Sequence, residues 1–208
     1  MKSILQSYIK RVEGLENIPQ KGGFIIVANH NNHLDSFILS SIIKKHSGRI
    51  IKFLSRKDII LWRIIGQWGA DRLSAILVDP KKKGESLNVA LEALNMGEII
   101  GIYPEAQLND NDYLLPPRSG TARLALWTGF PVVPVGISQG PGAHRGLYLL
   151  KDIIFSFKNS TVIKFGKPMQ FDVCQESFIP KDMLNQTSDQ IMSVISTLCA
   201  KTYRPQIS

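Results

Sequence analysis

The sequence predicts a single α/β domain in which a mixed, largely parallel β-sheet is flanked by helices. The first observation behind this prediction is that short apolar runs alternate along the chain with longer segments of helical periodicity. The second is size and composition, because 208 residues, 44% of them hydrophobic and 20% charged, suit one sizeable globular core. We therefore expect residues 1–208 to form one domain.

The first elements surround a buried strand. Residues 1–13 have apolar side chains at the spacing of one helical face, so we expect a short basic helix that packs on the core or rests on a membrane surface. Glycine and proline make 13–23 a loop. The apolar run 24–28 predicts a buried strand, which is followed by a polar loop, 29–33, and a helix that begins near Asp35.

The later elements continue the alternation. Prolines in 130–138 suggest an irregular strand or a pocket-lining loop, although a purely structural role is equally open. Residues 153–157 and 162–165 suggest a closing β-hairpin, and Thr187 predicts the N-cap of a final helix, about residues 187–202. The elements expected between these ends are strand 49–54, a helix capped by Ser55, strand 73–78, helix 85–96, strand 99–103 and helix 119–128.

The formal net charge of +8 restricts the possible partners. A basic surface suits nucleic acid, anionic lipid headgroups or an acidic acyl carrier. We expect no nucleic-acid partner, because the chain has no zinc-finger spacing, aromatic-basic RNA motif or obvious recognition helix. Cys174 and Cys199 lack the spacing of a metal or redox site, which favours a reducing compartment.

Membrane segments are not expected. The N-terminal residues lack the apolar core of a secretory signal, and no apolar stretch approaches the roughly 20 residues of a spanning helix. We therefore expect a cytoplasmic protein that is peripheral at an anionic membrane surface and has no transmembrane helix.

The strongest candidates for chemistry are His30 and Asp35. His30 falls in the loop after the buried strand, and Asp35 falls in the first turn of the next helix. A carboxylate in that place can accept a hydrogen bond from one imidazole nitrogen, which leaves the other nitrogen to take a proton from a substrate. Two alternatives stay open: Asp35 serves only the helix terminus, or His33 joins the pair in a metal site, although no thiol lies nearby.

This stretch resembles the first motif of the phospholipid/glycerol acyltransferase family (lysophosphatidate acyltransferase-like enzymes), in which Asn-His is followed by four residues and Asp. Residues 75–79, 102–105 and 133–137 resemble the family's second, third and fourth motifs, in the family's order. The resemblance covers roughly residues 15–170.

The resemblance implies an O-acyltransferase that moves a fatty acyl group from acyl-CoA or acyl carrier protein to a hydroxyl of a 1-acylglycerol-3-phosphate-like lipid. It makes His30 the general base, oriented by Asp35, and implies neither a metal nor a cofactor beyond the acyl donor. Glu105 would position the acceptor or hold its loop. The residues that the resemblance implies for substrate binding are Glu105, Gln107, Arg118, Arg56 and Lys57. For the three basic residues, the alternative is that each is an exposed surface charge.

Four positions depart from the family pattern, one of them Gln107, which stands where the family has threonine. Leu108 and Pro80 stand where the family has arginine, and leucine offers phosphate no donor in place of a bidentate guanidinium. Ala106 replaces a glycine and disfavours the backbone geometry that glycine permits. Two further functions therefore stay open: acyl transfer to an acceptor without phosphate, such as an aminolipid or a metabolite, and non-catalytic binding of lipid or acyl carrier.

Overall fold

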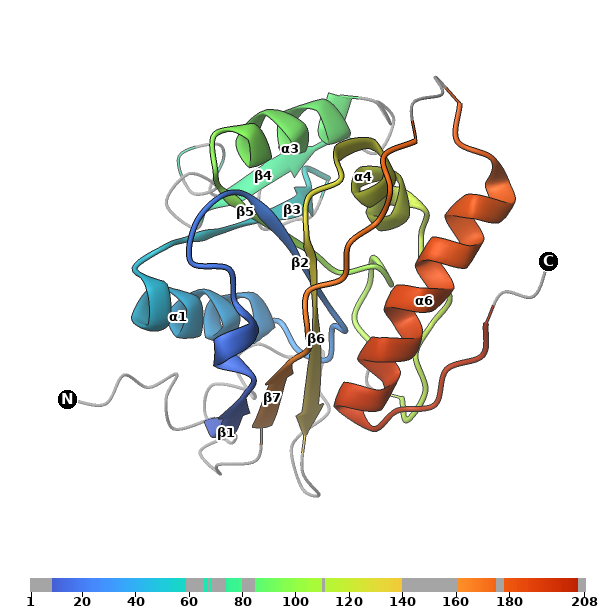
Figure 1. Ribbon diagram of the computed structural model, residues 1–208. Coiled ribbons are helices and arrows are strands. Elements are labelled where there is room, and N and C mark those ends of the chain that lie inside the picture. The colour runs from blue at the N-terminus through green and yellow to red at the C-terminus, as the bar shows by residue number, and fades with distance from the viewer. Residues whose placement is uncertain are drawn as a thin grey trace.

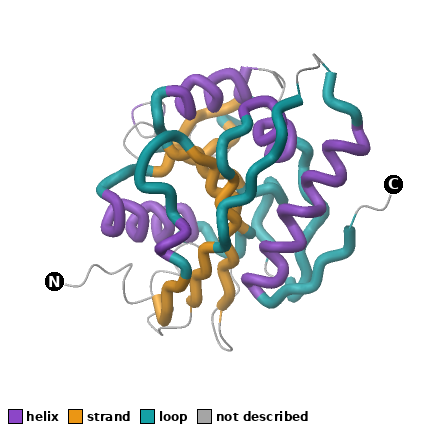
Figure 2. The backbone as a smooth tube through the Cα atoms, in the orientation of Figure 1, coloured by secondary structure: helices purple, strands orange, loops and turns teal. Residues whose placement is uncertain are grey.

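The computed structural model has a seven-stranded sheet at its centre, with helices on both faces (Figures 1 and 2). The structure describes residues 9–58, 66, 68, 74–79, 85–109, 111–139, 161–174 and 178–205. The α/β class and the mixed, largely parallel sheet predicted from the sequence are confirmed. None of the described helices combines the length and the hydropathy needed to cross a bilayer.

The sheet has the order β1-β7-β6-β2-β5-β3-β4. The β6–β7 pair is antiparallel, and the other neighbours are parallel. β2 therefore lies in the interior of the sheet, between β5 and β6. The strands are β1 Ile9–Glu13, β2 Phe24–Ala28, β3 Ile51–Arg56, β4 Ala75–Val78, β5 Ile99–Ile102, β6 Val132–Gln139 and β7 Thr161–Phe165.

Glycines end two of the helices that flank the sheet. Gly48, at φ +71°, and Gly129, at φ +62°, adopt the left-handed conformation that commonly closes the C-terminus of a helix. This conformation is unfavourable for a residue that has a side chain. The helices are α1 Asp35–Ser47, α3 Glu85–Asn95, α4 Gly120–Thr128 and α6 Lys181–Cys199, with a short 3-10 turn, η2, at Leu15–Asn17.

Both faces of β2 are buried. Successive side chains of a strand point to opposite faces of the sheet, so the residues of β2 enter two different cores. Phe24 and Ile26 belong to the core on the α1 side. Ile25 and Val27 belong to the core formed with α3, α4 and α6. The loop after β2 is thus anchored in a strand whose five residues are all buried.

The last helix, α6, approaches the sheet closely at Gly136. A Cβ atom at Gly136 would lie 2.4 Å from the Cβ of Leu198, so the helix and a side chain cannot both occupy this place. The final turn of α6 therefore lies directly against the backbone of β6.

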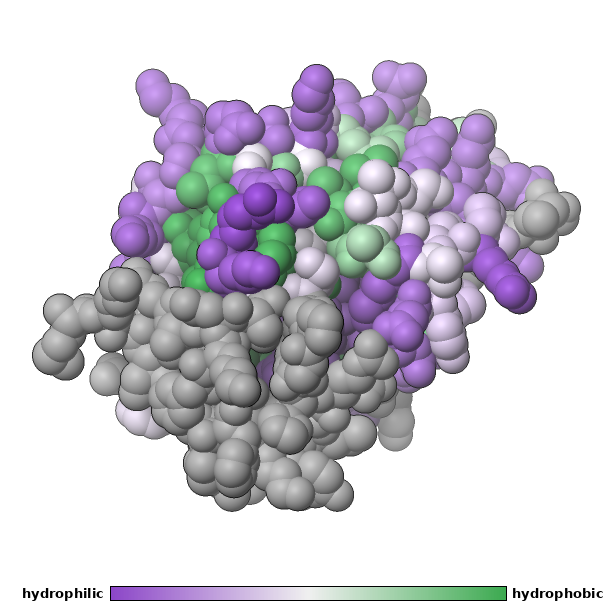
Figure 3. Space-filling view, turned by 90° about the horizontal axis from the view of Figure 1, so that it is seen from below, coloured by the Kyte–Doolittle hydropathy of each residue, from purple (hydrophilic) through white to green (hydrophobic). Residues whose placement is uncertain are grey.

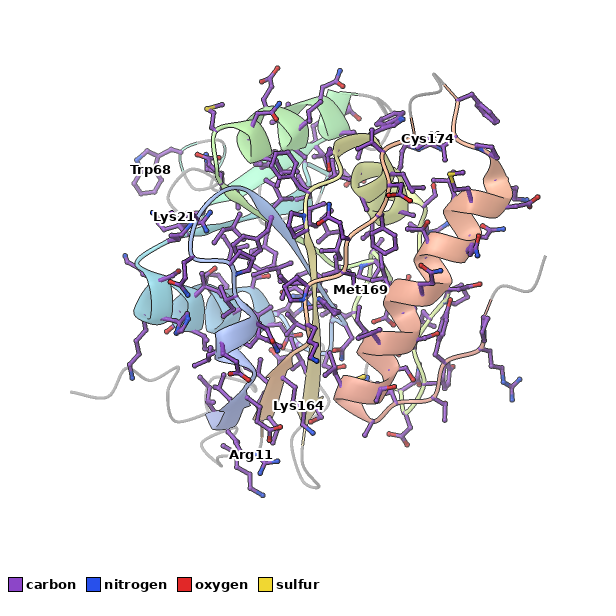
Figure 4. The ribbon with its side chains drawn as sticks, in the orientation of Figure 1. Arg11, Lys21, Trp68, Lys164, Met169 and Cys174 are labelled. Carbon is purple, nitrogen blue, oxygen red and sulfur yellow. The ribbon has the colours of Figure 1, made fainter. Side chains whose placement is uncertain are left out.

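The helix predicted for residues 1–13 is wrong in its described part. Residues 9–13 form β1, an edge strand that pairs with β7, and residues 1–8 lie outside the described part of the chain. Over five residues, helical spacing and strand alternation are hard to separate, and a partner strand far along the chain decides between them. Arg11 and Lys164 lie near the lower end of these strands in Figure 4, where both pair with Glu13.

Two predicted boundaries are also wrong. The helix that Ser55 was expected to cap does not begin there, because β3 continues through Arg56 and pairs with β4 up to that residue. The final helix begins at Lys181, after Pro180, and Thr187 is a buried residue inside it. Proline is compatible with the start of a helix although its side chain forms no cap hydrogen bond. The prediction looked for a threonine cap and therefore placed the start of the helix too late.

The predictions for the last strands need correction as well. β6 is a regular strand: Pro134 precedes Val135, at which pairing with β7 begins, so its missing N–H removes no bond of that ladder. The hairpin partner predicted for β7 is wrong, because β1 and β6 occupy both of its edges. Residues 153–157 themselves lie outside the described part of the chain.

Candidate active site

The candidate site lies where the central strands end. His30 follows β2, Glu105 follows β5 and Lys57 follows β3, and parallel pairing brings these three loops to the same edge of the sheet. The carboxyl edge is where open α/β sheets hold their ligands. Seen from this end in Figure 3, hydrophobic surface lies directly beside hydrophilic groups.

His30 and Asp35 form a hydrogen-bonded pair, as the sequence predicted. Nδ1 of His30 lies 3.1 Å from Oδ2 of Asp35. A carboxylate accepts hydrogen bonds, so Nδ1 carries the proton and Nε2 of the neutral ring is left as an acceptor. The side chain of Asp35 is 1% exposed and that of His30 is 17% exposed. The carboxylate of Asp35 is therefore shielded from solvent, whereas the imidazole of His30 remains partly accessible.

The carboxylate of Asp35 is fixed by the loop that it ends. Its Oδ2 also accepts the backbone N–H groups of Asn31, at 2.7 Å, and Asn32, at 2.8 Å. Asn32 closes the turn, because its Oδ1 accepts the N–H of Leu34 at 2.8 Å. Asp35 is the first residue of α1, yet its side chain reaches back into the loop, which disfavours a role limited to the helix terminus.

Two aromatic rings support the imidazole from one side. The ring of Tyr103 stacks on that of His30 with centroids 3.9 Å apart and planes 11° apart. Phe53 stacks on Tyr103 in turn, at 5.3 Å. The Tyr103 hydroxyl lies 2.9 Å from Oγ of Ser36, and burial together with the negative charge of Asp35 raises the pKa of Tyr103. The phenol thus stays neutral beside the imidazole.

Glu105 is buried and joins three backbone segments. Its Oε1 lies 3.4 Å from the backbone nitrogen of His30, and its Oε2 accepts the N–H of Leu115 at 2.9 Å and Nδ2 of Asn109 at 2.6 Å. Asn109 in turn donates its N–H to the carbonyl of His30, at 2.7 Å. Of the two roles expected for Glu105, these contacts fit that of holding the loop.

Two buried asparagines fasten the other side of the loop to β6. Asn29 exchanges two hydrogen bonds with the backbone of Ile137, its Oδ1 accepting at 2.7 Å and its Nδ2 donating at 2.9 Å. Nδ2 of Asn31 donates to the same Ile137 carbonyl, at 2.7 Å. His30 therefore stands between two side chains that are tied to the core.

The other predicted binding residues lie at or after the ends of β3 and β5. Gln107 and Arg118 are exposed, and the N–H of Arg118 donates to the carbonyl of Pro104, so both belong to the loop system after β5. Nζ of Lys57 lies 2.7 Å from Oδ2 of Asp79, across the ends of β3 and β4. Arg56 is the last residue of β3, and the orientation of its side chain lies outside the described part of the structure.

No cluster of three or more His, Cys, Asp or Glu suited to a metal occurs among the described residues. His33, the remaining candidate ligand of the loop, is exposed, whereas Asp35 is engaged by the three donors described above. What the arrangement can do is accept a proton at Nε2 of His30, which makes no hydrogen bond to the described residues.

Four residues that help to hold this site were not predicted from the sequence: Asn31, Tyr103, Asn109 and Lys201. Asn31 and Tyr103 lie within the quoted motifs and Asn109 lies four residues after Glu105, so their proximity in sequence to His30 and Glu105 was the available signal. Lys201, whose Nζ lies 2.6 Å from Oδ1 of Asn31, carried no local signal because 170 positions separate the two.

Comparison with known proteins points to one family. A family model described as "Acyltransferase" matches residues 10–138. A 1-acyl-sn-glycerol-3-phosphate acyltransferase of Borreliella burgdorferi is 29% identical over 195 residues, which cover 90% of this chain and 72% of the relative. The chloroplastic enzyme of the same description from Brassica napus is 29% identical over 137 residues, and that from Bacillus subtilis is 27% identical over 139 residues.

Coverage of these relatives is unequal. The chain spans 38% of the length of the Brassica protein and 66% of the Bacillus protein. A solved structure supports the fold: the 1-acyl-sn-glycerophosphate acyltransferase of Thermotoga maritima superposes with a TM-score of 0.64 at 20% identity, covering 94% of this chain and 76% of that one.

Proposed function

The chain belongs to the acyltransferase family, and on that premise we propose that it moves a fatty acyl group from a thioester to a hydroxyl of a 1-acylglycerol-3-phosphate-like lipid. The single observation that carries this proposal is the His30–Asp35 pair, in which a buried carboxylate orients a reachable imidazole. The relatives named for this reaction support the acceptor class.

His30 acts as the general base in this proposal. Nε2 takes the proton of the acceptor hydroxyl as its oxygen attacks the carbonyl carbon of the thioester. Asp35 stabilises the resulting imidazolium through Nδ1. The C–S bond then breaks, and the thiolate leaves with the proton that His30 returns, so the products are an ester and a free thiol. No covalent intermediate with the protein is required.

The donor and the place of action follow from the same chemistry. Acyl-CoA or acyl carrier protein supplies the thioester as a co-substrate, and we propose no further cofactor. The lipid acceptor resides at a membrane surface, and the net charge of +8 favours an anionic one. The protein would act there as a peripheral enzyme facing the cytoplasm.

A second candidate keeps the base and changes the acceptor. Leu108 stands at the place of a phosphate-binding arginine in the family pattern, and it is partly buried in the loop after Glu105. An acceptor without phosphate, such as an aminolipid or a metabolite, would not need the missing guanidinium. Arg118, exposed beside this loop, is the basic residue that would serve a phosphate if one is bound.

The test measures free thiol released from acyl-CoA and from acyl carrier protein, with phosphorylated and non-phosphorylated acceptors. We expect acceptor-dependent release by the wild type and a loss on the order of 10³-fold in His30→Ala. His33→Ala is the matched control, because His33 is an exposed histidine of the same loop. Equal release by the wild type and His30→Ala would reject the mechanism, and lipid binding without any transfer would favour a non-catalytic protein.

A further inference from the structure

Lys201 follows the last helix, far from His30 in sequence, yet its ammonium group lies at the candidate site. Nζ donates to Oδ1 of Asn31 at 2.6 Å and to the carbonyl of Asn109 at 3.0 Å. These two residues hold opposite sides of the same backbone: Asn31 directly follows His30, and Asn109 donates its N–H to the His30 carbonyl. Lys201 thus connects the loop of the proposed base with the loop of Glu105.

We propose that Lys201 is a positioning residue that sets the geometry of His30 and Asp35 through Asn31. This inference rests on the proposed function for its kinetic part. It also assigns a role to a segment that lies beyond the residues 10–138 matched by the family model.

The amide of Asn31 is the point through which Lys201 acts. An ammonium group only donates hydrogen bonds, so it requires the oxygen of the amide to face it. Oδ1 of Asn31 also accepts from Nδ2 of Asn29, at 3.1 Å, and the amide nitrogen is thereby directed to the carbonyl of Ile137. With the side chain fixed, the Asn31 N–H remains aimed at Asp35.

The backbone around Lys201 is arranged to direct it inward. Ala200 adopts the left-handed conformation, with φ +56°, which is unfavourable for any residue with a side chain. The turn is fixed by Ser196, whose carbonyl accepts the Lys201 N–H at 3.2 Å and whose Oγ donates to the Lys201 carbonyl at 2.6 Å. Thr202 then pairs with 112–114, the segment that precedes the Glu105 contact at Leu115.

The contacts predict what removal of the ammonium group does. In Lys201→Met the amide of Asn31 is released from its charged donor, and the loop around His30 gains freedom. We expect kcat for acyl transfer to fall about 10- to 100-fold while KM changes less than about threefold, because orientation of the base is lost and acceptor contacts are not. Lys201→Arg, which retains donors and charge, is expected to recover part of the loss.

A matched control separates positioning from stability. Tyr203 lies two residues further along the same segment and donates its hydroxyl to Asp189 on α6, outside the site. Tyr203→Phe loosens the segment without touching Asn31 or Asn109. If Lys201→Met loses no more turnover than Tyr203→Phe at equal thermal stability, Lys201 is structural only and the proposal is wrong.

A spectroscopic readout tests the inference independently of turnover. The proton shared by Nδ1 of His30 and Asp35 should give a downfield proton NMR signal that is absent in His30→Ala. We expect the signal to weaken through solvent exchange in Lys201→Met and to persist in Tyr203→Phe. An unchanged signal in Lys201→Met overturns the inference, whereas an inactive wild type with a changed signal rejects the proposed function alone.

Discussion

The loops after β2 and β5 lie at the same edge of the sheet and are built in opposite ways. In the first, Asn29, Asn31 and Asp35 are buried, and their polar atoms are bonded to backbone groups, to one another or to the side chains of His30 and Lys201. In the second, Glu105 and Asn109 are buried, but the residues between them are not: Ala106 and Gln107 are exposed and Leu108 is partly buried.

This difference separates the residues that govern the proton from those that meet the acceptor. A substitution of Asn29, Asn31 or Asp35 in the first loop leaves a buried polar group without its partner, which costs about 1–3 kcal/mol before any effect on chemistry. A substitution at 106–108 disturbs no such bond. The chain matches the family pattern at His30, Asp35 and Glu105 and departs from it at the more accessible residues 106–108, as this asymmetry leads one to expect.

The largest effect should come from Asp35→Asn. The amide cannot carry the charge that stabilises a protonated His30, and its neutral oxygen is a weaker acceptor for the three donors that meet at Oδ2. We expect kcat to fall on the order of 10³-fold or more and the free energy of unfolding to fall by about 1–3 kcal/mol. Steady-state kinetics and urea unfolding measure both. Asp172→Asn, an exposed control, should leave each unchanged.

Glu105→Gln should have the next largest effect. One oxygen of the carboxylate meets two donors, from Asn109 and Leu115, and the other faces the backbone nitrogen of His30, so an amide leaves at least one donor opposed by another donor. We expect about a 10- to 100-fold loss of kcat with a lower unfolding midpoint. Glu92→Gln, on the exposed side of α3, is the control. Unchanged turnover would mean that the two loops are not mechanically linked.

Leu108→Arg probes the exposed loop directly. A guanidinium at this position restores the fork that the family uses for phosphate, so the ratio of kcat/KM for phosphorylated over non-phosphorylated acceptors should rise about tenfold. Leu108→Met is the control, because it changes the side chain at this position without adding a charge. A ratio that stays constant would indicate that the acceptor phosphate, if present, is bound elsewhere, with Arg118 the next residue to replace.

The smallest effect is expected from Ala106→Gly. Ala106 has φ +56°, where glycine lacks the steric penalty of a Cβ atom, so the substitution should stabilise the fold by about 0.5–1 kcal/mol despite the added freedom of the unfolded chain. Gly48→Ala is the reverse experiment, at φ +71° with no atom within 4 Å of the new Cβ, and should destabilise by a similar amount. Chemical unfolding measures both, and equal signs would contradict the explanation.

Local sequence patterns predicted the centre of the fold and the reactive pair. The run 24–28 is apolar throughout because both faces of β2 are covered, and five positions suffice to bring Asp35 back to His30. The same kind of pattern failed at residues 9–13, whose conformation depends on pairing with β7. Lys201 could not be found in this way, because its role exists only after α6 has packed on Gly136.

The pairing of β1 with β7 has a consequence for the order in which the molecule is made. Ile9 is synthesised 152 residues before Thr161, its neighbour in the sheet. β1 must therefore remain unpaired, with its edges able to bind other chains, while β2, β3, β4 and β5 can already assemble. β1 thus precedes the other described strands in synthesis and is incorporated only after β7 has formed, which makes its unpaired edge a place where the nascent chain is prone to aggregate.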